Sequence, residues 1–185
     1  MRIPIIVLFV FMCLAQLAIP GKMIWDSERV VTEGTLYKFR TQPVDPSDPF
    51  RGKYITLNFL ADHGYDTAKW SSGEDVNVVF GTDSAGFATV SRLTRTEPEG
   101  PYLHTTIYYV DNDSDVHFNI PFTRFYMEES KAMPAEQYYN ESTRDSASVC
   151  YGLVRIGRGN AVITDVFIDN RSIVDLVRES QGDKR

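Results

Sequence analysis

The stretch PVDPSDPFRGKYITLNF, residues 43–59, decides the fold. Its two Asp-Pro pairs restrict the backbone, because proline fixes its own φ and pushes the residue before it towards an extended conformation. The end of the stretch alternates, and Ile55, Leu57 and Phe59 share one face of a strand predicted for residues 54–60. The pattern therefore predicts a stiff connector that leads into a half-buried strand and sets its register.

Alternating and aromatic-rich segments continue along the chain, which is typical of a β domain. The further strands are predicted at residues 35–41, 76–80, 87–93, 104–110, 116–120 and 122–127, with two more around a turn at 157–160 and another turn at 169–171. One short helix is expected at residues 133–142, with Pro134 at its first position. The sequence predicts a mainly β fold, an antiparallel β-sandwich or partly open barrel, since closure hides strand edges.

The N-terminal segment predicts a transmembrane helix. An apolar run begins at Ile3 and ends at Pro20 without a charged residue, and eighteen helical residues span roughly 27 Å, close to the hydrocarbon thickness of a bilayer. Helical spacing of apolar residues continues beyond it, Trp25 suits the membrane interface, and Gly34 suits a helix end. We therefore expect one helix over residues 3–33 that carries the domain off the membrane.

A cleaved signal peptide is the alternative for this segment. It usually has a shorter apolar core and small residues before its cut. A cut after Ala18 or Gly21 has Gln16 or Ile19 at the −3 position, so we expect an uncleaved anchor. Arg2 predicts a cytoplasmic N-terminus in the inner membrane and a periplasmic or otherwise extracytoplasmic domain. The expected parts are an anchor with its extended helix over residues 1–34, a β domain over 35–178 and a polar tail over 179–185.

The composition excludes some functions. Lys and Arg number 19 against 25 Asp and Glu, which gives a net charge of −6. Nucleic-acid binding needs concentrated basic residues, so no nucleic-acid partner is expected. The two cysteines, Cys13 in the apolar run and Cys150 in a predicted strand, are not expected to pair, and Cys150 is expected to be an inert core residue.

Residues 52–59 resemble the signature of the GDYXXLXY family of bacterial membrane-anchored proteins, which reads Gly-Asp-Tyr, two residues, Leu, one residue, Tyr. Gly52, Tyr54 and Leu57 match this signature, whereas Lys53 and Phe59 depart from it. The stretches MIWDSERVVTEG, PVDPSDPFRG, PFTRFYMEES and GNAVITDVFIDNRSI are similar to family features as well. The resemblance implies a topology and a fold rather than a reaction. Since lysine cannot replace an aspartate as an acid or a metal ligand, catalysis at position 53 is not expected.

Residues at the start of this motif are candidates for either a binding site or a structural contact. Arg51 can bind a carboxylate or a phosphate through its forked guanidinium. The interpretation that we prefer is a clamp in which Arg51 pairs with Asp45, Asp48 or Glu128. Gly52 is expected to allow a positive φ or a close approach at the start of the strand.

Later residues complete this candidate site. Tyr54 can hold a ligand or bury its ring with a hydrogen-bonded hydroxyl, and Leu57 is expected in the core. Arg124, Tyr126 and Glu128 are expected near the end of one strand, where they meet the Arg51 stretch across the sheet. Such a seam is either a partner surface or, as we prefer, an internal network of ion pairs.

No metal site and no cofactor are expected. His63, His104 and His117 are dispersed along the sequence, whereas a zinc site needs convergent ligands. The acidic stretch DNDSD lacks the glycine and the terminal glutamate of an EF-hand loop. Motifs for a phosphate loop, a dinucleotide or a nucleophile elbow are not found.

These observations favour a single-pass, non-enzymatic accessory or interaction protein. Its expected partners are the membrane, through residues 3–20, and another membrane or envelope protein. The alternative is a ligand-binding or hydrolytic domain with a site around Arg51, Tyr54, Arg124 and Glu128. A third hypothesis is a structural envelope protein whose long helix is a spacer. The sequence specifies no ligand, no particular partner and no oligomeric state.

Overall fold

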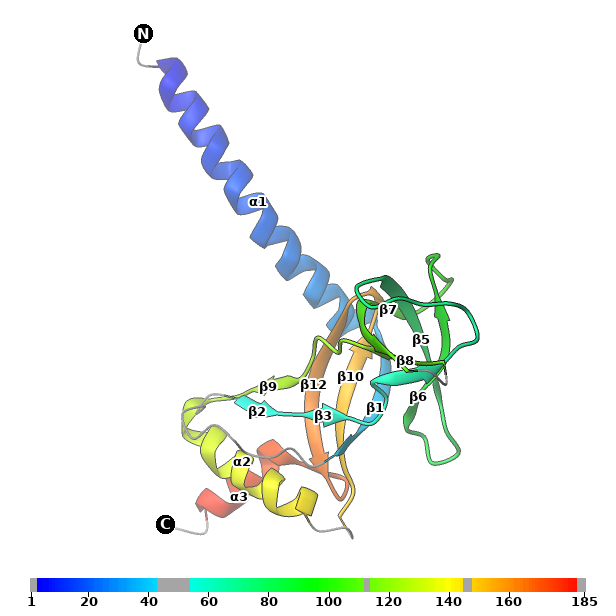
Figure 1. The fold of residues 1–185 in the computed structure, drawn as a ribbon. Helices are drawn as coiled ribbons and strands as arrows, with labels where there is room; N and C mark the ends of the chain where they lie inside the picture. The colour runs from blue at the N-terminus through cyan, green and yellow to red at the C-terminus, as the bar shows by residue number, and fades with distance from the viewer. Residues whose placement is uncertain (1–2, 43–53, 112–113, 145–147, 183–185) are drawn as a thin grey trace.

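The computed structural model describes residues 3–42, 54–111, 114–144 and 148–182 (Figure 1). The mainly β architecture predicted from the sequence is confirmed. In chain order the elements are α1 (Ile3–Glu33), β1 (Thr35–Gln42), β2 (Tyr54–Thr56), β3 (Asn58–Phe59), β4 (His63–Tyr65), β5 (Asp75–Thr82), β6 (Ala88–Thr94), β7 (Tyr102–Val110), β8 (Asp115–Phe118), β9 (Arg124–Tyr126), α2 (Glu129–Arg144), β10 (Cys150–Ile156), β11 (Arg158–Gly159), β12 (Ala161–Ile168), β13 (Arg171–Ser172) and α3 (Ile173–Gly182).

Two main sheets and a small ribbon make up the domain. The first sheet has the strand order β13-β12-β10-β1-β3, and the second has the order β4-β8-β7-β5-β6 with β11 beside β7. The pairings are antiparallel, as predicted, except for β11 with β7 and an isolated parallel bridge between β1 and Phe87. Strands β2 and β9 form the ribbon. In the described residues the sheets stay open and do not close into a barrel. Figure 1 shows α1 projecting from one end of the domain, while α2 and α3 lie at the other.

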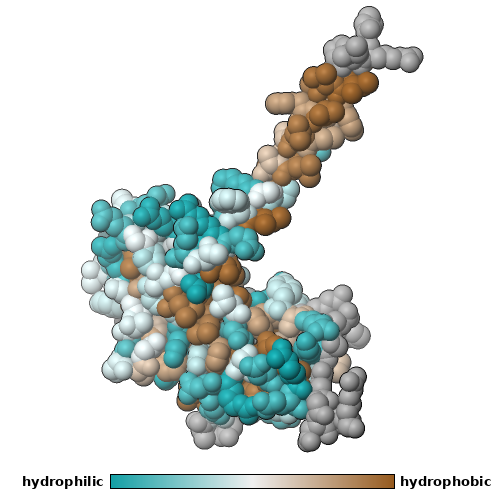
Figure 2. Space-filling view, turned by 180° about the vertical axis from the view of Figure 1, so that it is seen from behind, coloured by the Kyte–Doolittle hydropathy of each residue, from teal (hydrophilic) through white to brown (hydrophobic). Residues whose placement is uncertain are grey.

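Helix α1 has the length and the apolar composition needed to cross a membrane. It passes through Pro20 and ends at Glu33, which confirms the predicted helix. Its 31 residues rise about 46 Å, against about 30 Å for the hydrocarbon layer of a bilayer. Figure 2 shows the apolar part of α1 as a hydrophobic rod that projects away from the domain, with more polar residues between them. Beyond this part, ion pairs of Lys22 with Asp26 and of Arg29 with Glu33 suit an aqueous environment.

The end of α1 is fixed to the first sheet by a contact that we call the clasp, formed by Val30, Gly34, Arg155 and Gly157. Only Gly34 separates the helix from β1, and its amide donates to the carbonyl oxygen of Val30 at 2.9 Å. The Arg155 guanidinium donates to the carbonyl oxygen of Gly34 at 2.9 Å. Val30 is buried, and a Cβ atom at Gly157 would lie 2.9 Å from its side chain. The helix therefore enters the domain without a flexible linker.

The decisive stretch forms two short strands instead of the single strand predicted for residues 54–60. Strand β2 pairs with β9, whereas β3 pairs with β1. Between them the amide of Leu57 donates to the carbonyl oxygen of Thr123 at 2.8 Å. The predicted inward face is confirmed, because Ile55, Leu57 and Phe59 are all buried. The chain thus pairs first with β9 and then with β1, while every second side chain continues to point into the core.

An aromatic cluster joins the two main sheets. Phe39 of β1 is fully buried, and its ring meets those of Phe59, Phe80 and Phe122 at centroid distances of 5.7, 5.0 and 5.2 Å. These edge-to-face contacts add to the burial of large apolar rings. Since Phe80 lies on β5 and Phe59 on β3, the ring of Phe39 bridges the two sheets.

Two predictions about helices are wrong. Helix α2 begins at Glu129, so that Pro134 lies inside it and not at its first position. Starting earlier places both Ala132 and Ala135 in the buried interface, one turn apart, and this packing outweighs the missing amide of the proline.

The C-terminal segment also forms a helix that was not predicted. Helix α3 runs through Gly182, into the part expected to be a polar tail, and adds a second helix to the domain where one was expected. Ile173 and Val177 are four residues apart and fully buried. These side chains hold the helix against the domain, although the segment is mostly polar.

Replacing Phe39 by alanine is expected to destabilise the domain strongly. Removing a buried aromatic ring costs about 3–5 kcal/mol of unfolding free energy, through lost burial and the remaining cavity. The matched control is Leu36→Ala on the same strand, where the side chain is 47% exposed and little change is expected. Denaturant unfolding of the full chain in detergent, followed by circular dichroism, measures both. Equal losses in the two variants would contradict the assignment of Phe39 to the centre of the core.

Substitution at Gly34 is expected to loosen the clasp. A Cβ atom there would lie 2.4 Å from the carbonyl oxygen of Val30, which is backbone and cannot move aside cheaply. Gly34→Ala should therefore lower the unfolding midpoint and raise hydrogen exchange around residue 34. The control is Gly21→Ala within α1, where nothing lies within 4 Å of the new atom. If both alanine variants exchange as slowly as the unmodified chain, the clasp is not tight.

Candidate functional site

The motif of residues 52–59 divides between core and surface. Leu57 and Phe59 are buried, so they stabilise the domain and are not accessible to a partner. Tyr54 is half-buried and lies on the ribbon formed by β2 and β9. Of the predicted site residues, Asp45, Asp48, Arg51 and Gly52 lie outside the described residues, as does Lys53.

The half-buried Tyr54 and the exposed Arg124 and Tyr126 form one group, which we call the ribbon surface. The register pairs Tyr54 with Tyr126, and their ring centroids are 5.4 Å apart. The Arg124 guanidinium lies 5.1 Å from the centroid of the Tyr54 ring, a cation–π distance. Ile55 and Phe125 point the other way, into the core. The ribbon therefore turns two aromatic rings and a cation outward.

Strand β9 brings Arg124 and Tyr126 beside β2, whereas the expected contact of these residues and Glu128 with the Arg51 stretch stays a prediction, since Arg51 lies outside the described residues. The chemistry of the ribbon surface suits contact with carboxylates, aromatic groups and other protein side chains. Tyr126 is 64% exposed, so its ring contributes little to the core.

Glu128 lies just beyond this surface, before the first turn of α2. Its carboxylate pairs with the Lys131 ammonium at 2.6 Å. Its backbone carbonyl accepts bonds from the amides of Lys131 and Ala132, at 2.9 and 3.1 Å. These bonds place Glu128 at the start of the helix. Whether Arg51 reaches Glu128 stays a prediction, since Arg51 lies outside the described residues.

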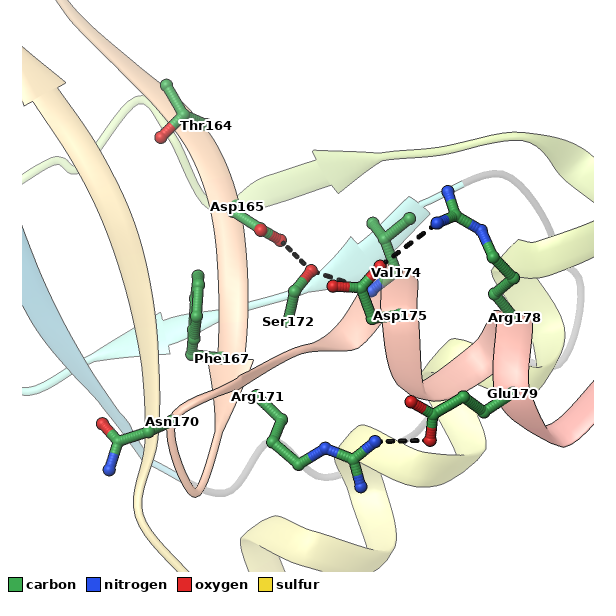
Figure 3. A pocket seen from close by; sticks show the side chains of 10 residues that line it. All are labelled: Thr164, Asp165, Phe167, Asn170, Arg171, Ser172, Val174, Asp175, Arg178 and Glu179. Carbon is green, nitrogen blue, oxygen red and sulfur yellow. Dashed lines mark hydrogen bonds and ion pairs between the residues drawn. The ribbon is translucent and has the colours of Figure 1, made fainter.

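A cavity of about 770 Å³ opens between β12, β13 and α3 (Figure 3). The Ser172 hydroxyl lies 3.2 Å from the Asp165 carboxylate and accepts the amide of Val174 at 3.2 Å, so it caps α3. Arg171 and Arg178 pair with Glu179 and Asp175 across the same corner. No histidine that could activate the Ser172 hydroxyl lies among the described residues that line this cavity. The arrangement is that of a helix cap rather than a nucleophile site.

Besides Ser172, the thiol of Cys150 is a candidate nucleophile. This residue is buried in β10, and burial, with a smaller effect from the charge of Asp169, raises the pKa of its thiol to about 11. A thiol with so high a pKa carries almost no thiolate at neutral pH. The geometry agrees with the expected inert core residue.

Sequence reasoning missed one cluster of polar side chains. The expectation of dispersed histidines is wrong for His63 and His117, which face each other across β4 and β8. Asp62 joins them, and its carboxylate lies 2.8 Å from His63 Nδ1. His104 lies apart and bonds Asn77 at 2.8 Å. Strand β4 is too short to show a periodic pattern, so only the HG dipeptide next to an aspartate could have hinted at it.

The comparisons with known proteins identify a family. A family model described as GDYXXLXY protein matches residues 16–166, which span the second half of α1 and most of the β domain. Neither a curated protein nor a solved structure matches the chain.

The alkylation rate of Cys150 tests whether its thiol is inert. In a Cys13→Ser background, iodoacetamide at pH 8 should modify the folded chain at least about a hundredfold more slowly than the unfolded chain, because raising a thiol pKa from 9 to 11 lowers the thiolate fraction by that factor. The matched control moves the thiol to the exposed neighbouring position, as Val149→Cys with Cys150→Ser, and should react quickly. Fast modification of folded Cys150 would contradict its burial.

Proposed function

The chain belongs to the GDYXXLXY family, and we propose that it acts as a single-pass, membrane-anchored accessory protein that binds another membrane or envelope protein. In this proposal residues 3–20 stay in the inner membrane. Arg2 keeps the N-terminus in the cytoplasm, and the β domain works on the periplasmic or extracytoplasmic side.

The observation that carries the proposal is the continuous path from α1 through the clasp into β1. A flexible tether lets a domain search a wide volume, whereas a helix that is packed into the domain fixes its height and orientation above the bilayer. Fixed height and orientation are useful when the target also has a fixed position relative to the membrane. Another membrane or envelope protein meets that condition better than a small ligand that diffuses freely.

The ribbon surface is the proposed contact with this partner. Tyrosine and arginine are enriched among residues that dominate binding energy, because they combine a large contact area with directed polar groups. Tyr126 and Arg124 are exposed and lie outside the core, so the domain does not depend on them for stability.

The hydrolytic or ligand-binding alternative receives less support from the described geometry. Arg124 lies against the Tyr54 ring and Glu128 pairs with Lys131, so neither group is directed at a common reaction centre. A second cavity, of about 530 Å³, lies beside the clasp. Neither this cavity nor the one beside α3 is lined by Tyr54, Arg124 or Glu128.

Site-specific crosslinking tests the partner surface. A photoreactive phenylalanine analogue in place of Tyr126 should give a discrete crosslinked product with a membrane or envelope protein in living cells. Adding Arg124→Ala should reduce the yield about tenfold, the loss typical of a binding hot spot. The control carries the analogue in place of Tyr65, which is 72% exposed on β4 and should give no such product.

Two outcomes would contradict the proposal. One is an equal crosslinking pattern at positions 126 and 65, or none at either. The other is a mature chain that begins beyond Gly21 and is released from membranes by alkaline carbonate, since such a chain has no anchor.

A further inference from the structure

The side chains of Asp62, His63 and His117 converge on the outer face of β4 and β8. One ligand atom from each residue lies within 4.8 Å of the other two. The register sets His63 directly opposite His117, with ring centroids 5.1 Å apart and planes inclined by 30°. Their side chains are 29%, 45% and 26% exposed for Asp62, His63 and His117, so a small ion can reach all three.

The backbone beneath this cluster is held firmly. Val116 and Phe118 flank His117 on β8 and are fully buried, so they fix which way its ring points. The Phe118 amide donates to the carbonyl oxygen of Asp62 at 3.0 Å. A Cβ atom at Gly64 would lie 2.6 Å from the side chain of Val90, so β4 packs closely against β6 at this point. Little backbone ordering therefore remains to be done when a ligand arrives.

The ligand set is that of a transition-metal site. Two imidazoles and one carboxylate suit Zn²⁺ and other first-row ions, and such three-residue sites leave a coordination position for water. Ligand atoms around a tetrahedral zinc lie roughly 3.3 Å apart, given metal–ligand distances near 2.0 Å. The three side chains reach this spacing by small rotations about their own torsions, because the backbone already places them together. We propose that Asp62, His63 and His117 bind a divalent transition-metal ion, for which Zn²⁺ is the probe.

The surroundings of the cluster favour a cation. The Asp115 carboxylate lies 3.8 Å from His117 Nε2 and brings a second negative charge to the site. The rings of Tyr108 and Tyr109 lie 5.9 and 5.6 Å from that of His117 and shield one side of it.

The site would also connect elements that are far apart in sequence. Strand β4 is a strand of three residues at the edge of its sheet, and within the described parts of the chain it pairs with β8 only. An ion bound by His63 and His117 bridges the two strands directly. Binding in the folded chain only would raise the temperature at which it unfolds.

Zinc titration of the full chain in detergent tests the proposal, with the protein purified through a tag that contains no histidine and freed of metal by a chelator. Calorimetry should show one equivalent of Zn²⁺ with a dissociation constant in the micromolar range. His63→Gln and His117→Gln should each weaken binding at least tenfold. His104→Gln is the matched control, because it removes the third histidine away from the site, and it should bind as the unmodified chain does.

Co²⁺ absorption supplies a second measurement that does not depend on heat. Intense visible bands of low-coordinate cobalt should appear with the unmodified chain and with His104→Gln, and should be lost in His63→Gln and His117→Gln. Circular dichroism of each metal-free variant confirms that it is folded. A dissociation constant above 1 mM for the unmodified chain, or Zn²⁺ binding that is unaffected in the double variant His63→Gln with His117→Gln, would overturn the proposal.

Discussion

The structure depends on the position of one ring, that of Phe39 at the centre of β1. This strand is the direct continuation of the anchor helix, pairs with β10 along one edge and with β3 along the other, and turns Phe39 inward. The ring of Phe39 contacts that of Phe80 in the second sheet, so the second sheet packs against β1, the strand that follows α1. Any shift of β1 along its neighbours would move Phe39 out of this cluster and pull the clasp apart. The position of Phe39 therefore fixes both the packing of the core and the orientation of the domain relative to α1.

The same constraint explains how the exposed groups separate from the buried ones. Strand β2 supplies Ile55 to the core, and pairing with β9 leaves Tyr54 beside Tyr126 on the outside. An exposed cation–π contact such as that of Arg124 contributes only about 0.5–1 kcal/mol to stability. Changes on the ribbon surface should thus have little effect on folding, whereas changes at Leu57, three residues after Tyr54 in the same motif, destabilise the domain because this side chain is buried.

Sequence reasoning captured what depends on local periodicity. It predicted α1, its end at Gly34, most strands and the inward direction of Ile55, because each of these features can be recognised from the residues of its own segment. It missed what depends on distant pairing. Strand β4 is recognisable only from its partner β8, and Ile173 and Val177 identify α3 only once the surface that they cover exists. The same holds for sites, since His63 and His117 are dispersed in the sequence and adjacent in the sheet. Arg124 and Tyr54 could be considered together beforehand, because each lies in a segment whose sequence predicts a strand, residues 122–127 and 54–60.

The length of α1 has a physical meaning for an acidic domain. The apolar run ends at Pro20, and the thirteen helical residues that follow rise about 20 Å. The headgroup layer takes up roughly 6 Å of this height, which leaves about 14 Å, more than the Debye length of about 8 Å at physiological salt. A domain with excess negative charge is repelled by anionic headgroups at closer range. With residues 3–20 in a bilayer, as we propose, the rod would hold the domain where this repulsion is screened, and the clasp would keep the ribbon surface at a fixed height.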